Sequence, residues 1–256
     1  MRLATWNVNS IRAREERVLR WLEARRPDVV CFQELKVTEE AFPFEVLREH
    51  GYHAAVRGQK TYNGVAILAR TPPEQVEKGF GDGEDDAEAR LVAARIGEVH
   101  VVSVYVPNGA QVGSEKWAYK LEWLGRLRAW LDRRFEKNDL VALCGDMNVA
   151  PEARDVHDPE RWEPTVLFHP EARRAYEQVR AWGLVDAFRL HHDEAGFYSW
   201  WDYRMLAFPR NRGLRIDHID LSEPLARRCT GAAIDRDERK GRQPSDHVPV
   251  VVELEV

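Results

Sequence analysis

The sequence predicts an α/β fold in which mixed β-sheets pack face to face and helices cover the outside. Short apolar runs recur along the chain and end in polar or acidic residues, which is the pattern of buried strands. Amphipathic helical segments separate some of these runs. Others follow one another through glycine-containing turns with no helix between them. A purely alternating doubly wound sheet would not contain such pairs, so packed mixed sheets fit the order better.

The predicted strands are the apolar runs themselves. They cover residues 2–6, 29–32, 52–56, 64–69, 90–96, 99–106, 140–145 and 215–221, and a last run follows His247. Their lengths match the range of about four to eight residues that is typical of buried strands.

Three helices are predicted between the strands. The first begins at Ser10 as its N-cap and ends before Pro27, because proline cannot continue a helix. The second begins near Ser114, and the third runs from Glu171 to Trp182 and is closed by a glycine. The apolar stripe of the second helix consists of Trp117, Leu121, Leu124, Leu127, Leu131 and Phe135.

Length and composition indicate one domain over residues 1–256. Hydrophobic residues make up 44% of the chain, enough to build a core, and no run approaches the roughly 18–20 apolar residues of a membrane span. The N-terminus lacks the apolar centre of a signal peptide, so we expect a cytoplasmic protein with no membrane contact. Cys31, Cys144 and Cys229 are far apart, and we expect buried thiols rather than a disulfide framework or a zinc site.

Charge limits how the chain could bind nucleic acid. The 38 Lys and Arg residues against 43 Asp and Glu give a net charge of −5, which excludes the strongly basic class of sequence-blind coat proteins. Any contact with DNA must therefore be local. Residues 203–216 contain four arginines and no acid, whereas residues 82–88 are almost all acidic and are expected to form a solvated loop.

Acidic and amide side chains stand at the ends of several predicted strands. Asp146 and Asn148 are two residues apart, so both side chains point to one face, and Asn7 and Asn9 repeat this spacing. A carboxylate beside an amide can orient a water and bind a developing oxyanion. Turn chemistry is the alternative for each pair alone. Glu34 also ends a strand, where its carboxylate needs either a divalent cation such as Mg²⁺ or an arginine partner.

His247 has acids on two sides, because Asp246 precedes it and Asp217 lies in the strand before it. Two carboxylates can hold a histidine as an imidazolium that donates to a phosphate oxygen, and a surface or capping role is the alternative. Tyr105 stands at another strand end. Together with it, the candidate residues of these two paragraphs are rich in acids and poor in thiolates. The sequence has no GxSxG, Walker, GxGxxG or HExxH motif. Metal-assisted phosphoester hydrolysis is therefore the reaction that the candidate residues support best.

These residues belong to longer motifs that extend from Asn7 to His247. The motifs are WNVNSIRAR, CFQELK, YNGVAIL, VYVPNG with GSEKWAYKLEWL, CGDMNVAP, SWWDYR, NRGLRIDHI and PSDHVPV. In this order they resemble the exonuclease III family of abasic-site endonucleases, within the endonuclease/exonuclease/phosphatase superfamily. The resemblance implies a DNase I-like four-layer α/β sandwich, with two packed mixed sheets flanked by helices and the active site at one edge.

The resemblance also implies a role for each position. The metal shell would consist of Glu34 as principal ligand with Asn7, Asp146, Asn148, Asp246 and His247 in or next to it. Asp146 would orient or deprotonate the attacking water, and Asn148 would stabilise the oxyanion. Tyr105 would contact the phosphate. Asp217 would orient His247, whose imidazole would contact the scissile phosphate.

The stretches SWWDYR and GLRI resemble the parts that build an apolar pocket. Trp200, Leu214 and Ile216 would enclose a flipped-out deoxyribose without its base, and a core cluster is the alternative. Only one of Trp200 and Trp201 should face the pocket, and motif position favours Trp200. Candidates for backbone contacts are Arg204, Arg210, Arg212 and Arg215, above all Arg210 and Arg212.

The resemblance thus implies a DNA repair nuclease that uses Mg²⁺, with Mn²⁺ as an alternative ion. It would hydrolyse the phosphodiester 5′ to an abasic site and would also act as a 3′ to 5′ exonuclease and clean damaged 3′ ends on double-stranded DNA. We expect a monomer. Two alternatives remain, a related phosphoesterase for inositol phosphates or sphingolipids and a non-catalytic nucleic-acid-binding regulator. The arginines of residues 203–216 argue against the first, and the complete polar set argues against the second.

Overall fold

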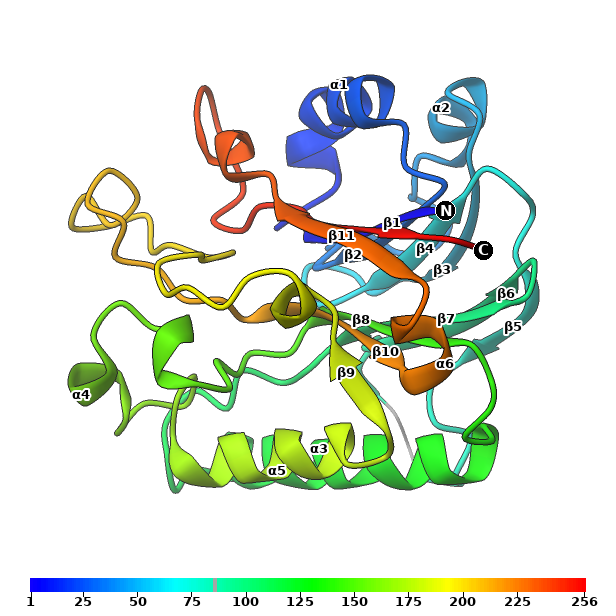
Figure 1. Ribbon diagram of the computed structural model, residues 1–256. Coiled ribbons are helices and arrows are strands. Elements are labelled where there is room, and N and C mark those ends of the chain that lie inside the picture. The colour runs from blue at the N-terminus through cyan, green and yellow to red at the C-terminus, as the bar shows by residue number, and fades with distance from the viewer. Residues whose placement is uncertain (85–86) are drawn as a thin grey trace.

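Two six-stranded mixed sheets pack face to face in the computed structural model, which describes residues 1–84 and 87–256 (Figure 1). The first sheet has the order β11 (Cys229–Ile234), β12 (Val250–Leu254), β1 (Arg2–Asn7), β2 (Val29–Gln33), β4 (Val65–Ala69) and β3 (His53–Arg57). The second has the order β5 (Glu74–Lys78), β6 (Leu91–Ile96), β7 (Val99–Tyr105), β8 (Val141–Asp146), β10 (Asp217–Ser222) and β9 (Leu184–Asp186).

Helices cover both outer faces. α1 (Glu15–Arg25) and α2 (Phe44–Glu49) lie over the first sheet, and α3 (Glu115–Arg134) and α5 (Pro170–Arg180) lie over the second (Figure 1). The predicted four-layer α/β sandwich is therefore confirmed. The short elements are α4 (Pro159–Trp162), α6 (Glu223–Ala226) and the 3₁₀ turns η1 (Arg12–Arg14), η2 (Ala153–Asp155), η3 (Phe188–Leu190) and η4 (Arg236–Arg239).

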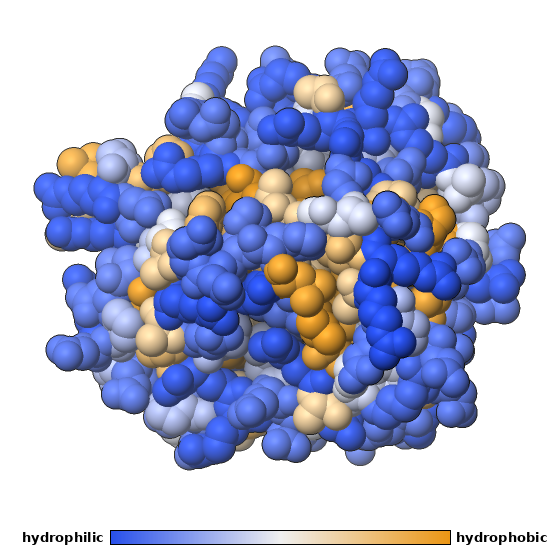
Figure 2. Space-filling model, in the orientation of Figure 1, coloured by the Kyte–Doolittle hydropathy of each residue, from blue (hydrophilic) through white to orange (hydrophobic). Residues whose placement is uncertain are grey.

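One face of the molecule is mostly polar. Figure 2 shows that hydrophilic side chains predominate on this face and that apolar side chains are gathered in smaller areas, the clearest of them near its middle. Within residues 1–84 and 87–256, no helix has the length and apolarity that crossing a membrane requires. The predicted acidic loop at residues 82–88 lies partly outside the described residues; at its start, Asp82 pairs with Arg126 of α3 at 2.9 Å.

The central strands bury side chains on both faces, which explains their uninterrupted apolar sequences. On β2, Cys31 packs between the two sheets and Phe32 packs beneath α1. On β8, Cys144 joins the layer between the sheets and Leu143 packs against the layer of α3. The predicted burial of Cys31 and Cys144 is confirmed, whereas Cys229 on the edge strand β11 is only half-buried.

The start of α1 differs from its prediction. Ser10 is not its N-cap, because Asn9 and Ser10 both have positive φ angles, 46° and 88°, and the N–H of Ser10 donates to the carbonyl of Glu34 instead. The chain then forms η1, and α1 begins at Glu15. α3 begins next to Ser114 as predicted, and Ser114 is its N-cap, since Ser114 Oγ accepts from the backbone N–H of Trp117 at 3.2 Å.

Each sheet contains one parallel pair joined by a covering helix, β1–α1–β2 and β7–α3–β8. The register pairs Asn7 with Gln33, Tyr105 with Asp146, and Asp146 with Asp217. Parallel strands end at the same edge of a sheet, so polar residues that follow them are brought together. This edge lies away from the chain termini, which are side by side at the other end of the sandwich (Figure 1).

A buried ion network supports the start of β10. Arg215 is fully buried, and its guanidinium donates to Asp155 Oδ1 at 2.7 Å and to Asp186 Oδ2 at 2.7 Å. These bonds hold η2 and β9 against the strand that begins with Asp217. The prediction that Arg215 contacts DNA is therefore wrong, because its charge is used inside the protein.

We expect Arg215→Met to lower the free energy of unfolding by about 3–5 kcal/mol, because Asp155 and Asp186 would stay buried without their shared cation. Urea unfolding followed by circular dichroism measures this loss. Arg204→Met is the control: the Arg204 side chain is 84% exposed, and we expect a change within about 0.5 kcal/mol. Equal effects of the two substitutions would contradict the structural role of Arg215.

Candidate active site

Polar side chains from both sheets meet where β1, β2 and β8 end. One carboxylate oxygen each of Glu34 and Asp146 and a ring nitrogen of His247 lie within 4.8 Å of one another. Asn7 connects the two acids, since its Nδ2 donates to Glu34 Oε1 at 2.9 Å and to Asp146 Oδ2 at 2.9 Å. The structure therefore brings together residues from the first, the middle and the last part of the chain.

The backbone at this edge is held in left-handed conformations. Glu34 has φ 52° and Asn148 has φ 48°, a region that costs a non-glycine residue about 1–3 kcal/mol. The neighbouring Gly145 cannot be replaced, because a Cβ there would lie 1.9 Å from the carbonyl oxygen of Val104 on the paired strand β7. Tight pairing of β7 and β8 and the two unusual turns thus direct Glu34 and Asn148 to the same edge.

His247 is held between two acids. Its Nδ1 lies 2.8 Å from Asp217 Oδ2, and its Nε2 lies 3.8 Å from Asp146 Oδ2. Burial alone would lower the pKa of His247, but the charges of Asp217 and Asp146 outweigh burial and raise it to about 10. The ring is therefore an imidazolium at neutral pH. Ser199, which the sequence did not single out, donates to Asp217 Oδ2 at 2.6 Å and fixes that carboxylate.

Asp146 is almost fully buried and hydrogen-bonded on both oxygens. Its Oδ1 accepts from the backbone N–H of Asn148 at 2.9 Å, and its Oδ2 accepts from Asn7. Burial raises the pKa of Asp146 to about 7, although the His247 charge acts in the opposite direction. A carboxylate whose pKa lies near the working pH is suited to accept a proton from water.

Two amides and a phenol lie at or just after the ends of β7 and β8, near this carboxylate. Asn148 Nδ2 donates to the carbonyl of Val106 at 2.9 Å, and its Oδ1 accepts from Asn108 Nδ2 at 3.1 Å. Burial raises the pKa of Tyr105 well above its ordinary value, and the charges of Glu34 and Asp146 act in the same direction. Tyr105 therefore stays a neutral hydrogen-bond donor.

Asp246 lies beside the group of three rather than within it. Its Oδ1 accepts from Asn9 Nδ2 at 2.9 Å, and its Oδ2 accepts from Trp200 Nε1 at 3.0 Å. Lys36 Nζ contacts Asn9 Oδ1 at 2.6 Å and Glu34 Oε2 at 3.0 Å. Both oxygens of Asp246 thus have protein partners in this structure.

The donor set fits a hard divalent cation. Proteins hold Mg²⁺ through one or two carboxylates together with substrate phosphate, and Glu34 and Asp146 supply two carboxylates at one point. A ring nitrogen of His247 belongs to the same group. As an imidazolium this ring donates to a phosphate oxygen, and as a neutral imidazole its Nε2, which lies 3.8 Å from Asp146 Oδ2, could instead bind the metal.

The predicted sugar-pocket residues lie next to this cluster. Trp200 is half-buried and packs edge-on against Trp162, with ring centroids 6.0 Å apart, whereas Trp201 is fully buried in a separate cluster. Leu214 and Ile216 are 0% and 1% exposed and belong to the core cluster on which Trp200 packs. Trp200 is therefore the member of this trio that reaches the surface.

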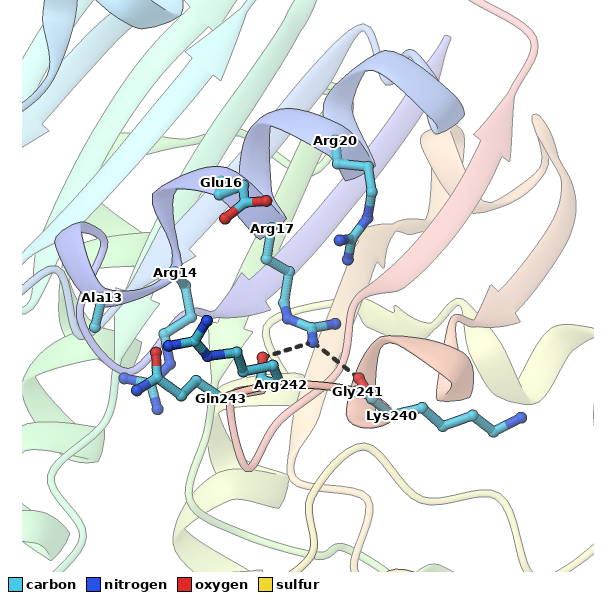
Figure 3. Close-up of a pocket in the computed structure, with 9 residues that line it drawn as sticks. All are labelled: Ala13, Arg14, Glu16, Arg17, Arg20, Lys240, Gly241, Arg242 and Gln243. Carbon is cyan, nitrogen blue, oxygen red and sulfur yellow. Dashed lines mark hydrogen bonds between the residues drawn. The ribbon is translucent and has the colours of Figure 1, made fainter.

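The arginines predicted to contact DNA lie outside the cluster. Arg210 and Arg212 are exposed and line a hollow of about 740 Å³ next to α4. A second hollow, of about 430 Å³, lies between α1 and the turn before β12, and five of its lining residues are basic (Figure 3). They are Arg14, Arg17, Arg20, Lys240 and Arg242.

This second hollow, which we call the basic hollow, adjoins the site. Arg17 donates to the carbonyls of Lys240 and Arg242 (Figure 3). Arg14 donates to the carbonyl of Asn9 at 2.6 Å. The sequence did not reveal it, because its two sides are more than two hundred residues apart and meet only in the fold.

Comparison with known proteins agrees with this geometry. Residues 4–247 match the model of the Endonuclease/Exonuclease/phosphatase family. Exodeoxyribonuclease III of Haemophilus influenzae is 36% identical over 266 residues, which cover 99% of this chain and 100% of that protein. An AP endonuclease structure from Archaeoglobus fulgidus matches with a TM-score of 0.97 and 42% identity over 100% of both chains.

A 3′ phosphatase from Neisseria, solved with a product DNA hairpin, matches with a TM-score of 0.95 and 38% identity, again over 100% of both chains. Matches over the full chain at this identity define family membership. The chain belongs to the endonuclease/exonuclease/phosphatase family and, within it, to the exonuclease III group that its motifs indicated.

Proposed function

We propose that this chain is a Mg²⁺-dependent DNA repair nuclease that hydrolyses the phosphodiester 5′ to an abasic site. The observation that carries the proposal is the group of half-buried Glu34 with buried Asp146 and His247, on a surface that also has arginine-lined hollows. The relatives include an exodeoxyribonuclease, an AP endonuclease and a 3′ phosphatase. The chain would accordingly also act as a 3′ to 5′ exonuclease and clean damaged 3′ ends.

The side chains divide the reaction among them. Asp146 orients a water and takes its proton as the water attacks phosphorus in line with the departing 3′-oxygen. His247, Asn148 and Tyr105 donate to the oxygens of the phosphate, where negative charge develops. Mg²⁺, when bound at Glu34 and its neighbours, would stabilise charge on the phosphate and on the leaving oxygen. The products are a 3′-hydroxyl and a 5′-phosphate on the abasic residue.

Selectivity for abasic sites would arise at Trp200. A sugar without its base is extruded at little cost, and a small apolar pocket rejects a complete nucleotide by size. Leu214 and Ile216 lie behind the indole and would form the inner wall once Trp200 adjusts to the sugar. We propose that the protein works as a monomer in the cytoplasm, where its unpaired cysteines suit a reducing compartment.

Incision of a labelled duplex with one tetrahydrofuran residue tests the proposal directly. With Mg²⁺ we expect one product, cut 5′ to the tetrahydrofuran, and with a chelator we expect none. Asp146→Ala and His247→Ala should each lower kcat by about 10²–10³, because each removes one preorganised partner of the transition state. A denaturing gel measures all four reactions.

The same variants need a folding control. Circular dichroism and thermal melting should show that each variant keeps its fold, so that lost activity reports lost chemistry. Incision by Asp146→Ala at the wild-type rate, or incision that survives the chelator, would be inconsistent with the proposed mechanism.

Trp200→Ala should reduce incision at tetrahydrofuran more than exonuclease cleavage of an undamaged duplex, because only the first reaction needs the sugar pocket. We expect about a 10–100-fold loss of selectivity, the range that a few kcal/mol of lost pocket contact produces. Trp200→Phe keeps an aromatic ring and should fall between the wild type and Trp200→Ala. Rates on the two duplexes at subsaturating DNA give the ratio, and equal losses on both would argue against the pocket.

Arg210→Ala and Arg212→Ala should weaken DNA binding and make it less sensitive to salt. Each arginine that neutralises one phosphate adds about 0.9 to the slope of log Kd against log salt, so each substitution should reduce the slope by about 1. Arg95→Ala is the control, because Arg95 pairs with Glu74 on the second sheet and should leave the slope unchanged. Fluorescence anisotropy with chelator present measures binding without cleavage. An unchanged slope in both loop variants would exclude them from the interface.

A further inference from the structure

Lys120 is a fully buried lysine on the inner face of α3. The predicted apolar stripe assigned this face to Leu121, but Leu121 is half-buried and Lys120 lies beneath the ends of β7 and β8. Lysine is almost never buried without an acidic partner. In the described part of the chain, no carboxylate forms an ion pair with Lys120. Its burial therefore calls for another explanation.

Three backbone carbonyls satisfy the ammonium group completely. Lys120 Nζ donates to the carbonyl of Asn148 at 2.7 Å, to that of Val166 at 2.6 Å and to that of Asn108 at 3.2 Å. Two of these carbonyls belong to Asn108 and Asn148, whose side-chain amides bond to each other at the active site. An ammonium has three donors, so each one is used to fix a different segment of the chain.

The hydrocarbon stem of Lys120 also packs closely beneath the loop that contains Asn108 and Gly109. Gly109 has φ +93°, and a Cβ there would lie 3.0 Å from Lys120 Cδ and 3.2 Å from the ring of Trp117. The loop therefore rests directly on the stem. Asn108 and Asn148 are joined above it by the hydrogen bond between their side chains, so one lysine supports both halves of the pair.

We propose that Lys120 is a positioning residue that sets the place of the Asn108–Asn148 amide pair, and through it the oxyanion contact made by Asn148. Preorganised donors at a developing charge contribute strongly to catalysis, and small displacements of such donors lower kcat. Burial lowers the pKa of Lys120 to about 7, although the charge of Asp146 acts in the opposite direction. This inference rests on the proposed role of Asn148.

A double-mutant cycle of Lys120→Met and Asn148→Ala tests the inference with Mg²⁺ and the tetrahydrofuran duplex. Methionine keeps the length of the side chain and removes its three donors. We expect Lys120→Met to lower kcat by about 10²-fold with KM within about threefold, because binding depends on other residues. In the Asn148→Ala background the same substitution should cost less than about threefold, because its effect would pass through Asn148.

Leu127→Ala is the matched control on the same helix, since Leu127 is fully buried in the core beneath α3 and lies about two helical turns from Lys120. It should lower the melting temperature at least as much as Lys120→Met and leave kcat within about threefold of the wild type. If Lys120→Met does not fold, Lys120→Arg replaces it in the cycle, because arginine keeps the charge and the donors. We expect a smaller loss of kcat from Lys120→Arg, and again only in the protein that retains Asn148.

The outcomes distinguish a failure of the role proposed for Asn148 from a failure of the inference about Lys120. If Asn148→Ala alone keeps the wild-type kcat, the role proposed for Asn148 fails, and the inference about Lys120 fails with it. If Asn148→Ala is impaired but the lysine substitution costs the same in both backgrounds, only the inference about Lys120 is overturned. A loss of kcat in Leu127→Ala equal to that in Lys120→Met would also overturn it.

Discussion

The active edge depends on one buried imidazolium that balances the acids around it. His247 lies between Asp217 and Asp146, and its charge offsets the cost of burying carboxylates there, which is several kcal/mol for a buried carboxylate without a partner. The two acids belong to the second sheet, whereas His247 lies three residues before β12 of the first. Its carbonyl accepts from the indole of Trp6, which ties it to β1. The charge pair therefore joins the two sheets at their open rim as well as preparing a donor for the phosphate.

The sandwich supplies what this pair needs. In each sheet a parallel pair of strands ends at the same edge, so Asn7 and Glu34 arrive from one sheet while Tyr105 and Asp146 arrive from the other. The register places Asp146 directly opposite Asp217, and the absence of a side chain at Gly145 allows β7 and β8 to approach closely enough to keep that register. Side chains that are far apart in sequence thus meet because strand direction and register place them at the same edge.

Sequence patterns predicted the parts of the structure in which local chemistry and tertiary environment agree. The central strands are apolar on both faces because both faces are covered, so they could be recognised from composition alone. The edge strand β5 is mostly exposed and polar, and β9 has only three residues, so neither carries such a signal. Glu34, Asp146 and His247 could be named because they lie in motifs of a known family, although their distances could not.

Other residues could not be predicted, because their roles depend on contacts between distant segments. A lysine in a helix and an arginine in a loop are normally solvated, yet Lys120 and Arg215 are fully buried. Ser199 gains its importance from Asp217, which follows it by eighteen residues and reaches it only in the fold. Such buried polar residues are exceptions to residue preference, and they are found where the backbone around a site must be held in one arrangement.

Charge also explains why a chain with a net charge of −5 can act on a polyanion. Glu34, Asp146, Asp217 and Asp246 stand close together, and Lys36 and His247 offset only part of their charge. Such a cluster would repel a phosphate, and a divalent cation at Glu34 and Asp146 would reverse that balance. None of these four acids lines the basic hollow or the hollow of Arg210 and Arg212, so the basic side chains there can attract the DNA backbone without neutralising the cluster. Separation of the two charges lets one edge hold both a cation and an anionic substrate.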